Sequence, residues 1–238
     1  MLLSAILDQL AKGELSTLAN EYDEHTSGAL DYGSHESVIP HINLGLTALH
    51  TRFPLRKGKV IVQQFEAVST YYLELDYAAS TNSNVTDPTH YIADTNVSPF
   101  LSNILRIEKV IDELGELLPL NDPSEDTSLW MPQFNALEVP FPSDNVTMTV
   151  HFRANHPEVT NDDFDPETTK VLLPQAYLNC LLLFVAARVH ASVPSLEGTN
   201  NGAMYEAKYE RACMEIEHKG MVHKDESPQT KFSSRGFV

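Results

Sequence analysis

The chain has 238 residues, with 33 acidic against 16 basic side chains, a formal net charge of −17 at pH 7, and 42% hydrophobic residues. A chain of this length can bury a core without disulfides or metal ions to hold it. The acidic excess argues against a nucleic-acid-binding groove, because phosphates are bound by clusters of Lys and Arg. The opening stretch MLLSAILDQL lacks the basic start and the cleavage site of a secretory signal, so we expect an intracellular protein.

Two helices are predicted in the first part of the chain. Residues 2–20 place apolar side chains on one helical face, and the polar stretch 21–38 is predicted to be a loop. Pro40 suits the first turn of a second helix, because proline lacks an N–H that this turn would leave unbonded. The apolar residues of this helix, from Ile42 to Phe53, form one amphipathic stripe.

The hydrophobic period then changes to two, which predicts β-strands. Residues 58–64 and 70–78 are expected to form strands, and the Asn/Thr/Ser-rich stretch 79–99 is expected to be a long surface loop. A hairpin is predicted over 103–122, with its turn at Gly115.

The stretch NVTMTVHFR shows the alternation clearly, and the stretch FNALEVPFP before it is also predicted to be a strand. A strand with one buried face places every second side chain in the core. The inward set is predicted to be Met148, Val150 and Phe152, and the outward set Thr149, His151 and Arg153. Together these patterns predict a β-rich module of about six strands.

The helical period returns after Pro174, in the most apolar stretch of the chain, LNCLLLFVAARV. Its uninterrupted apolar run from Cys180 to Ala187 is only eight residues long. A membrane-spanning helix needs about 20, so we predict no membrane span. Apolar side chains cover most of the helix circumference, which is typical of the central helix of a bundle. The last predicted helix is amphipathic and is ended by Gly220.

This order of elements predicts an α+β fold: a four-helix bundle core with an inserted β-rich module resembling a sandwich or barrel. Residues 1–55 supply the first two helices, 56–160 the inserted module, and 161–220 the two helices that complete the bundle. Residues 221–238 are polar without an apolar period and are expected to be an extended C-terminal arm.

A search for catalytic and metal-binding motifs finds no phosphate-binding loop, no nucleophile elbow and no zinc signature. His151 and His156 make a weak candidate metal pair, and the acidic stretch 161–167 lacks the glycine and closing glutamate of a calcium loop. Cys180 and Cys213 are expected to be reduced, buried thiols. We therefore predict a non-enzymatic protein without a cofactor or metal site.

Seven stretches carry a family resemblance as a set and occur in the family's order: INLGLTALHTRFPLRKGKVIVQ, NILRIEKVIDELGELLPLND, FNALEVP, HFRANHPEV, LLPQAYLNCLLLFVAARVHAS, YEAKYERACMEIEHKGM and KFSSRGFV. Together they cover roughly two-thirds of the chain and resemble bacteriophage head-to-tail adaptor (connector) proteins, also called tail tubular protein A in short-tailed phages. The loop 79–99 and the first 38 residues have no counterpart in this resemblance.

The resemblance implies a virion protein that is made in the host bacterial cytoplasm and forms a homo-oligomeric ring of twelve copies below the phage portal. It implies further contacts with tail, nozzle or tail-fibre proteins, and DNA that passes through the lumen without specific binding. An acidic lumen would let DNA slide without sticking. The C-terminal arm is expected to dock on the portal, with Phe232 and Phe237 as anchors and Lys231 and Arg235 as charge contacts. The predicted portal-binding residues are Lys231, Phe232, Arg235, Gly236, Phe237 and Val238.

Two alternatives remain open at this stage. Another neck component, such as a stopper or tail-completion protein, would show a similar sequence pattern. A soluble metal-dependent enzyme or ligand-binding protein would use the acidic stretch 161–167 and nearby histidines to hold a cation.

Overall fold

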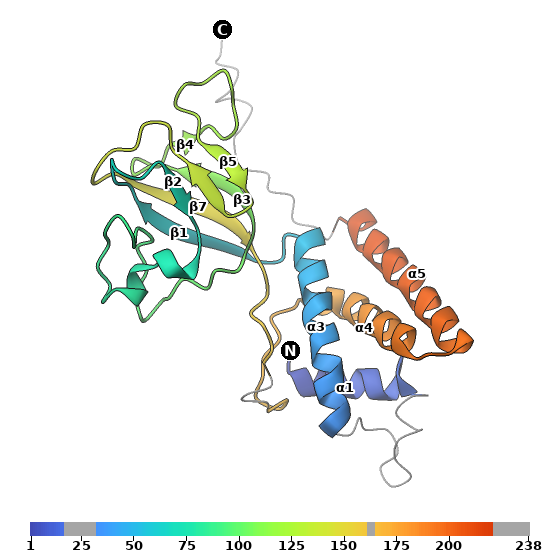
Figure 1. The fold of residues 1–238 in the computed structure, drawn as a ribbon. Helices are drawn as coiled ribbons and strands as arrows, with labels where there is room; N and C mark the ends of the chain where they lie inside the picture. The colour runs from blue at the N-terminus through green and yellow to red at the C-terminus, as the bar shows by residue number, and fades with distance from the viewer. Residues whose placement is uncertain (17–31, 161–164, 221–238) are drawn as a thin grey trace.

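The structure is a computed structural model that describes residues 1–16, 32–160 and 165–220, with side chains described from residue 37 onward in the second range. It confirms an α+β fold: the helices and the strands occupy two separate regions (Figure 1). Each region has its own cluster of buried apolar side chains.

Within the described residues the helical region contains four α-helices, which are α1 (Leu3–Lys12), α3 (Tyr32–Arg52), α4 (Leu178–Ser192) and α5 (Leu196–His218). Helix α4 follows a short 3-10 turn, η3 (Gln175–Tyr177), and packs against all three other helices. Its central position agrees with the apolar circumference seen in its sequence.

The predicted four-helix bundle is wrong. In a four-helix bundle the helices run nearly parallel or antiparallel along a shared core. Here α1 is only ten residues long and runs across the direction of α3 (Figure 1). Four consecutive residues of α4, Cys180 to Leu183, are buried, and consecutive residues point to different sides of a helix. Helix α4 therefore buries several sides against helices in different orientations.

Two predicted helix boundaries are also wrong. Helix α1 ends at Lys12, followed by Gly13, so it does not continue through residues 2–20. Helix α3 already runs from Tyr32, and Pro40 lies inside it instead of at its first turn. Val38 and Ile39, which precede Pro40, are only 3% and 2% exposed and extend the buried side of α3 upstream of it. Their burial outweighs the preference of proline for the first turn of a helix.

The sheet region lies between α3 and α4 in the chain and consists of two antiparallel sheets. The first sheet has the order β1-β7-β3-β4, formed by β1 (Lys57–Gln63), β7 (Thr147–Ala154), β3 (Ile104–Ile111) and β4 (Leu117–Leu118). The second has the order β2-β6-β5, formed by β2 (Thr70–Tyr72), β6 (Ala136–Glu138) and β5 (Trp130–Gln133).

The predicted strand 70–78 is wrong beyond its first three residues. Strand β2 ends at Tyr72, and two 3-10 turns follow, η1 (Leu75–Tyr77) and η2 (Ala79–Thr81). The alternation was misleading here, because none of the η1 residues is buried and Leu75, predicted to share a strand face with Tyr71 and Leu73, is 47% exposed. The stretch 79–99 is not only a surface loop either, since Ile92 is fully buried and bridges to β1.

The alternation predicted for β7 and the hairpin turn are confirmed. Met148, Val150 and Phe152 are buried, while the residues between them are partly exposed. Gly115 has a φ of +87°, a conformation that glycine adopts without steric cost, and it turns the chain from β3 to β4.

Both cysteines are buried and unbridged. Among the described residues, no helix combines the length and the apolar character that crossing a membrane requires.

Candidate functional site

The outward side of the four-stranded sheet concentrates cationic side chains in a protein of large negative charge. Strands β1, β7 and β3 place these side chains in two adjacent cross-strand rows. We call the six residues the basic face: Lys57, Arg153 and Arg106 in the first row, and Lys59, His151 and Lys109 in the second.

The other side of the same strands explains why these residues point outward. Val60, Val150 and Val110 lie opposite one another and belong to the core of the sheet region. Side chains alternate between the two faces of a strand, so the neighbours of these valines in β1 and β7 face away from the core. Lys59 is accordingly exposed and His151 half-buried.

A bulge in β3 completes the second row. Arg106 and Lys109 are three residues apart, and in a regular strand they would lie on opposite faces. The register shifts by one residue between Ile107 and Lys109, so Lys109 pairs with His151. An extra residue in one strand of a pair, called a β-bulge, changes the side of the sheet to which the following side chains point. Both Arg106 and Lys109 are therefore exposed on the same side of the sheet.

The charges on this face are packed closely enough to affect one another. Partial burial, followed by the positive charges of Lys109, Lys59 and Lys57, lowers the pKa of His151. A lowered pKa keeps the imidazole neutral at pH 7. The basic face thus carries five full positive charges from lysine and arginine side chains.

Arg153 ties the basic face to the helical region. Its Nε donates to Glu108 Oε1 at 3.3 Å, and its guanidinium also donates to the carbonyl oxygen of Thr51 in α3 at 3.0 Å. The Arg153 and Glu108 side chains are each only 21% exposed. Glu108 is the carboxylate that offsets part of the local positive charge.

An apolar row adjoins the basic face on the same side of the sheet. It consists of Ile61, Ile111 and Leu117, with the hydroxyl-bearing Thr149 between Ile61 and Ile111, and these residues pair in register across the four strands. Ile61 is 44% exposed and Leu117 57% exposed, so apolar surface lies open beside the lysines. Arginine is enriched at protein–protein interfaces, whose buried centre is apolar, and Arg153 and Arg106 lie in the farther row on this side of the sheet.

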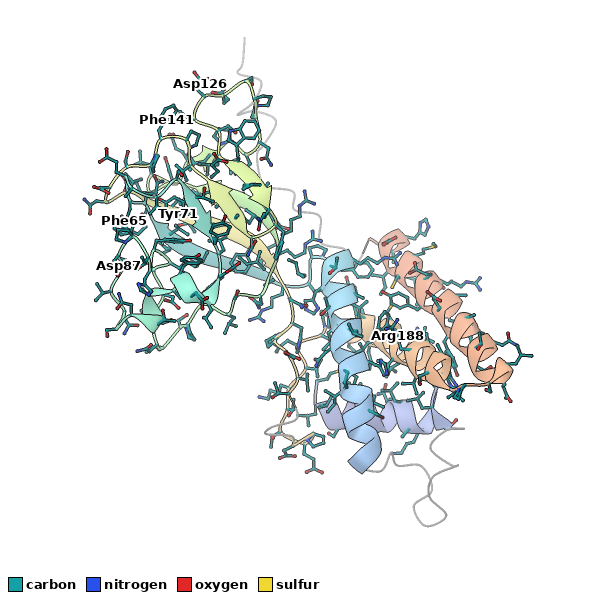
Figure 2. All side chains as sticks on the ribbon, viewed as in Figure 1. Phe65, Tyr71, Asp87, Asp126, Phe141 and Arg188 are labelled. Atoms are coloured by element: carbon teal, nitrogen blue, oxygen red, sulfur yellow. The ribbon has the colours of Figure 1, made fainter. Side chains whose placement is uncertain are left out.

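A surface of opposite charge lies at the far end of the sheet region. Strand β3 begins at Ile104, which pairs with Ala154 at the end of β7 that leads back to the helices. It ends at Ile111, and a group of acidic residues begins directly after it at Asp112. Figure 2 places Asp126 at the end of this region away from the helices. We call six residues the acidic end: Asp112, Glu113, Glu116, Asp122, Glu125 and Asp126. The chain has neither Lys nor Arg from Val110 to Phe152.

Two carboxylates shape the acidic end. Asp112 Oδ1 accepts hydrogen bonds from the backbone N–H groups of Leu114 and Glu116, at 2.9 and 2.7 Å. Asp122 Oδ1 accepts from the backbone N–H and the hydroxyl of Ser124, at 2.9 and 2.6 Å, and these bonds lower the pKa of Asp122. The turns are thus ordered, and the other carboxylates project from a defined backbone.

A buried histidine pair lies where the helical and sheet regions meet. His50 is fully buried, and its ring lies edge-on to that of His156, with centroids 5.7 Å apart. His156 uses both ring nitrogens, one to Pro157 O and the other as acceptor for the Leu172 N–H at 2.8 Å. His50 Nδ1 contacts Leu46 O at 2.8 Å, while its buried Nε2 has no partner among the described residues.

This environment favours uncharged histidines. Burial is the largest cause lowering the pKa of both His50 and His156, and the positive charge of Arg56 adds to it. Because His156 already has partners for both nitrogens, it offers no lone pair to a metal ion. The pair is therefore part of the packing between the two regions.

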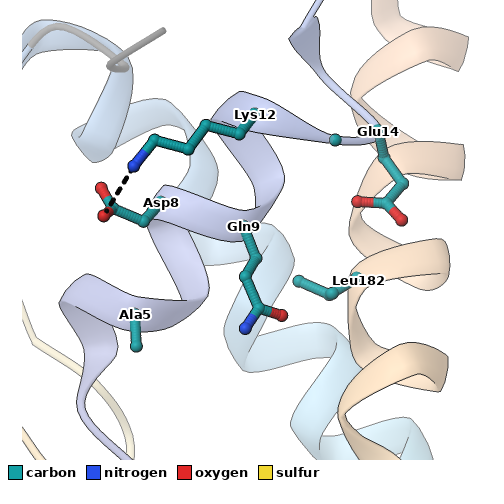
Figure 3. Close-up of a pocket in the computed structure, with 7 residues that line it drawn as sticks. Ala5, Asp8, Gln9, Lys12, Glu14 and Leu182 are labelled. Atoms are coloured by element: carbon teal, nitrogen blue, oxygen red, sulfur yellow. Dashed lines mark hydrogen bonds and ion pairs between the residues drawn. The ribbon is translucent and has the colours of Figure 1, made fainter.

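The hollow between α1 and α4 offers little chemistry (Figure 3). Its volume is about 550 Å³, and Asp8, Gln9, Lys12 and Leu182 line it. The Asp8 carboxylate and the Lys12 ammonium already pair at 3.2 Å, with both side chains about two-thirds exposed. An exposed pair of this kind contributes about 0–1 kcal/mol to stability.

The structure separates the two histidines of the weak candidate metal pair. His151 lies on the basic face and His156 in the buried junction. Within residues 1–16, 32–160 and 165–220, no group of three or more His, Cys, Asp or Glu side chains is placed to hold a metal ion. Residues 161–164 of the acidic stretch lie outside the described residues, as do all the predicted portal-binding residues of 221–238.

No family model matches the chain. A search of curated proteins finds no significant match.

Sequence reasoning missed the basic face. The outward positions of β7 were predicted, but the positions of Arg106 and Lys109 depend on a bulge that alternation does not reveal. One signal was available in the sequence: the run Arg52, Arg56, Lys57, Lys59 is basic within an acidic chain. The matching signal for the acidic end is the stretch from Val110 to Phe152, which contains neither Lys nor Arg.

Proposed function

We propose that the protein is a structural subunit of a ring that joins a phage portal to the tail around the DNA channel, which is the role of a head-to-tail adaptor. The seven ordered stretches of family resemblance support this role. The observation that carries it in the structure is the polarised surface: a basic face with an apolar row, and an acidic end elsewhere on the same sheet region.

Two different surfaces on one subunit favour assembly with other macromolecules. Head-to-tail contacts between different surfaces generate closed rings when the rotation closes. The exposed Ile61 and Leu117, with Arg106 and Arg153 on the same side of the sheet, also suit a protein interface, in which arginine is enriched and the buried centre is apolar. In this proposal the remaining acidic surface faces the DNA channel or solvent, where it repels the phosphate backbone.

The second part of the proposal concerns the portal. By resemblance, residues 221–238 dock on the portal through Phe232 and Phe237, with Lys231 and Arg235 in charge contacts. This arm follows α5, which ends at His218, and the described residues end at Gly220.

Electron microscopy of virions tests the position and symmetry of the ring. We expect twelve-fold class averages with the protein directly below the portal. A ring lower in the neck without portal contact would favour a stopper or tail-completion protein and contradict the adaptor role.

Deletion of residues 221–238 tests the arm. We expect the shortened chain to keep the far-UV circular dichroism of its helices but to lose attachment to portal-bearing, DNA-filled capsids in a co-sedimentation assay. Attachment at the full-length level would contradict docking through the arm. A double substitution, Phe232→Ala with Phe237→Ala, should reproduce the loss with the full-length chain.

A further inference from the structure

We propose that the basic face of one copy binds the acidic end of a second copy of this chain, and that this contact joins neighbouring subunits. The inference rests on the proposed function, because it identifies the partner of the basic face within the ring. It also makes a prediction about the isolated protein that does not require a portal.

Location and charge are the first argument. The first row of the basic face, with Lys57 and Arg153, lies at the end of the sheet next to α3, and the acidic end lies at the other end of the strands. Strand β3 covers eight residues between them, a length of about 25 Å at the usual rise per residue. The two surfaces are thus placed for contact between copies arranged head to tail.

The state of the charges within one copy is the second argument. In the part of the chain that the structure describes, Lys59 and Lys109 form no ion pair. The carboxylates of Glu113 and Glu125 likewise form none there, and both side chains are exposed. Both surfaces therefore keep charges available for a partner.

The apolar surroundings are the third argument, and they favour a protein over a nucleic acid. Ile61 and Leu117 lie beside the basic face, and Leu114 and Phe141 are 80% and 69% exposed near the acidic end. A phosphate backbone has no apolar groups to cover such residues, whereas a second protein copy buries apolar area and pairs charges together. Glu108, within the cationic rows, would also repel phosphate.

The rigidity of both surfaces is the fourth argument. Arg153 is fixed by Glu108 and by the end of α3, and the turns of the acidic end are fixed by Asp112 and Asp122. Surfaces ordered before contact lose less conformational entropy on binding.

Charge reversal in two variants tests the contact. The first variant is Lys59→Glu with Lys109→Glu, and the second is Glu113→Lys with Glu125→Lys. We expect wild-type protein to self-associate with rising concentration in sedimentation equilibrium. Each variant alone should associate on the order of 100-fold more weakly, because like charges then meet across the contact. An equimolar mixture of the two should regain association, because each supplies the surface that the other has lost.

Matched controls separate this contact from the effect of net charge. Lys12→Glu with Lys219→Glu changes the net charge as the first variant does, and Glu66→Lys with Glu206→Lys changes it as the second does; all four side chains are exposed and lie outside both surfaces. The association constants of these controls should lie within a few-fold of the wild-type value. Circular dichroism of every variant verifies that it is folded.

Three results would overturn the inference: wild-type protein that stays monomeric at every concentration, controls as weak as the variants, or a mixture that does not recover. Labelled duplex DNA is the remaining probe. Binding that is lost in the Lys59→Glu, Lys109→Glu variant and is not restored by mixing would assign the basic face to nucleic acid instead.

The outcomes also distinguish this inference from the proposed function. A ring below the portal, combined with unchanged association of the charge-reversed variants, would remove only the inference. Recovery on mixing, combined with wild-type association that stops at two copies, would support the contact and count against a ring.

Discussion

The helical region and the sheet region bury their apolar side chains in different ways. Helix α4 is buried on several sides, so its neighbours surround it and leave little of it for a partner. The four-stranded sheet buries one side in its own core and leaves the other side open. The helical region therefore mainly supports the fold, whereas the open side of the sheet is available for contacts with other molecules.

The largest effect is expected from a charge placed in the helical core. Leu181 is fully buried in α4, so Leu181→Asp would bury an unpaired carboxylate and should lower the free energy of unfolding by more than about 4 kcal/mol. Leu44→Asp is the matched control, because Leu44 lies on α3 and is 48% exposed. Urea denaturation followed by circular dichroism measures both. Equal stability of the two variants would contradict the central role of α4.

A smaller effect is expected from a methyl group added inside the sheet. Gly58 lies opposite Phe152, and a Cβ at residue 58 would come within 2.4 Å of the ring. Gly58→Ala should therefore cost about 1–3 kcal/mol of stability through displacement of the ring. The single tryptophan, Trp130 in β5, reports unfolding of the sheet region by fluorescence. A wild-type urea midpoint in this variant would show that the ring can move freely.

The junction between the two regions should make stability depend on pH. The folded-state pKa values of His50 and His156 lie below the ordinary 6.5, chiefly through burial. Well above pH 6.5 both residues are neutral in the folded and the unfolded chain. As the pH falls below 6.5, the unfolded chain takes up protons that the folded chain does not, so the free energy of unfolding should decrease.

Urea titrations between about pH 7.5 and pH 5.5 measure this slope. His50→Leu removes one of the two groups and should flatten it. If the variant kept the full wild-type slope, other groups would have to account for the acid sensitivity.

The smallest effect is expected on the basic face. Lys59→Ala removes an exposed ammonium that forms no ion pair in the described ranges, and the change in unfolding free energy should be about 0.5 kcal/mol or less. The same substitution should weaken self-association. A large loss of stability would place Lys59 in the structural part of the sheet and not in its contact surface.

Much of the fold could be predicted where the spacing of apolar residues in a segment matches the way the segment is buried. The alternation of Met148, Val150 and Phe152 matched a strand with one buried side, and Gly115 matched its turn. The strand predicted for 70–78 was wrong beyond Tyr72, because the alternating residues Leu75 and Tyr77 lie in a 3-10 turn that buries neither of them. Pro40 was misplaced because burial of Val38 and Ile39 extends α3 upstream of it.

The burial of α4 follows from its own sequence, because an apolar circumference predicts a central helix. The way the other helices meet α4 depends on the tertiary structure, because helix directions are set by how side chains of distant segments pack together. The tertiary structure also decided that Arg106 and Lys109 share a face with Lys57 and Lys59, since that depends on a bulge and on pairing between strands far apart in the chain. Local periodicity carries information on burial, and pairing between distant segments creates the charged surface.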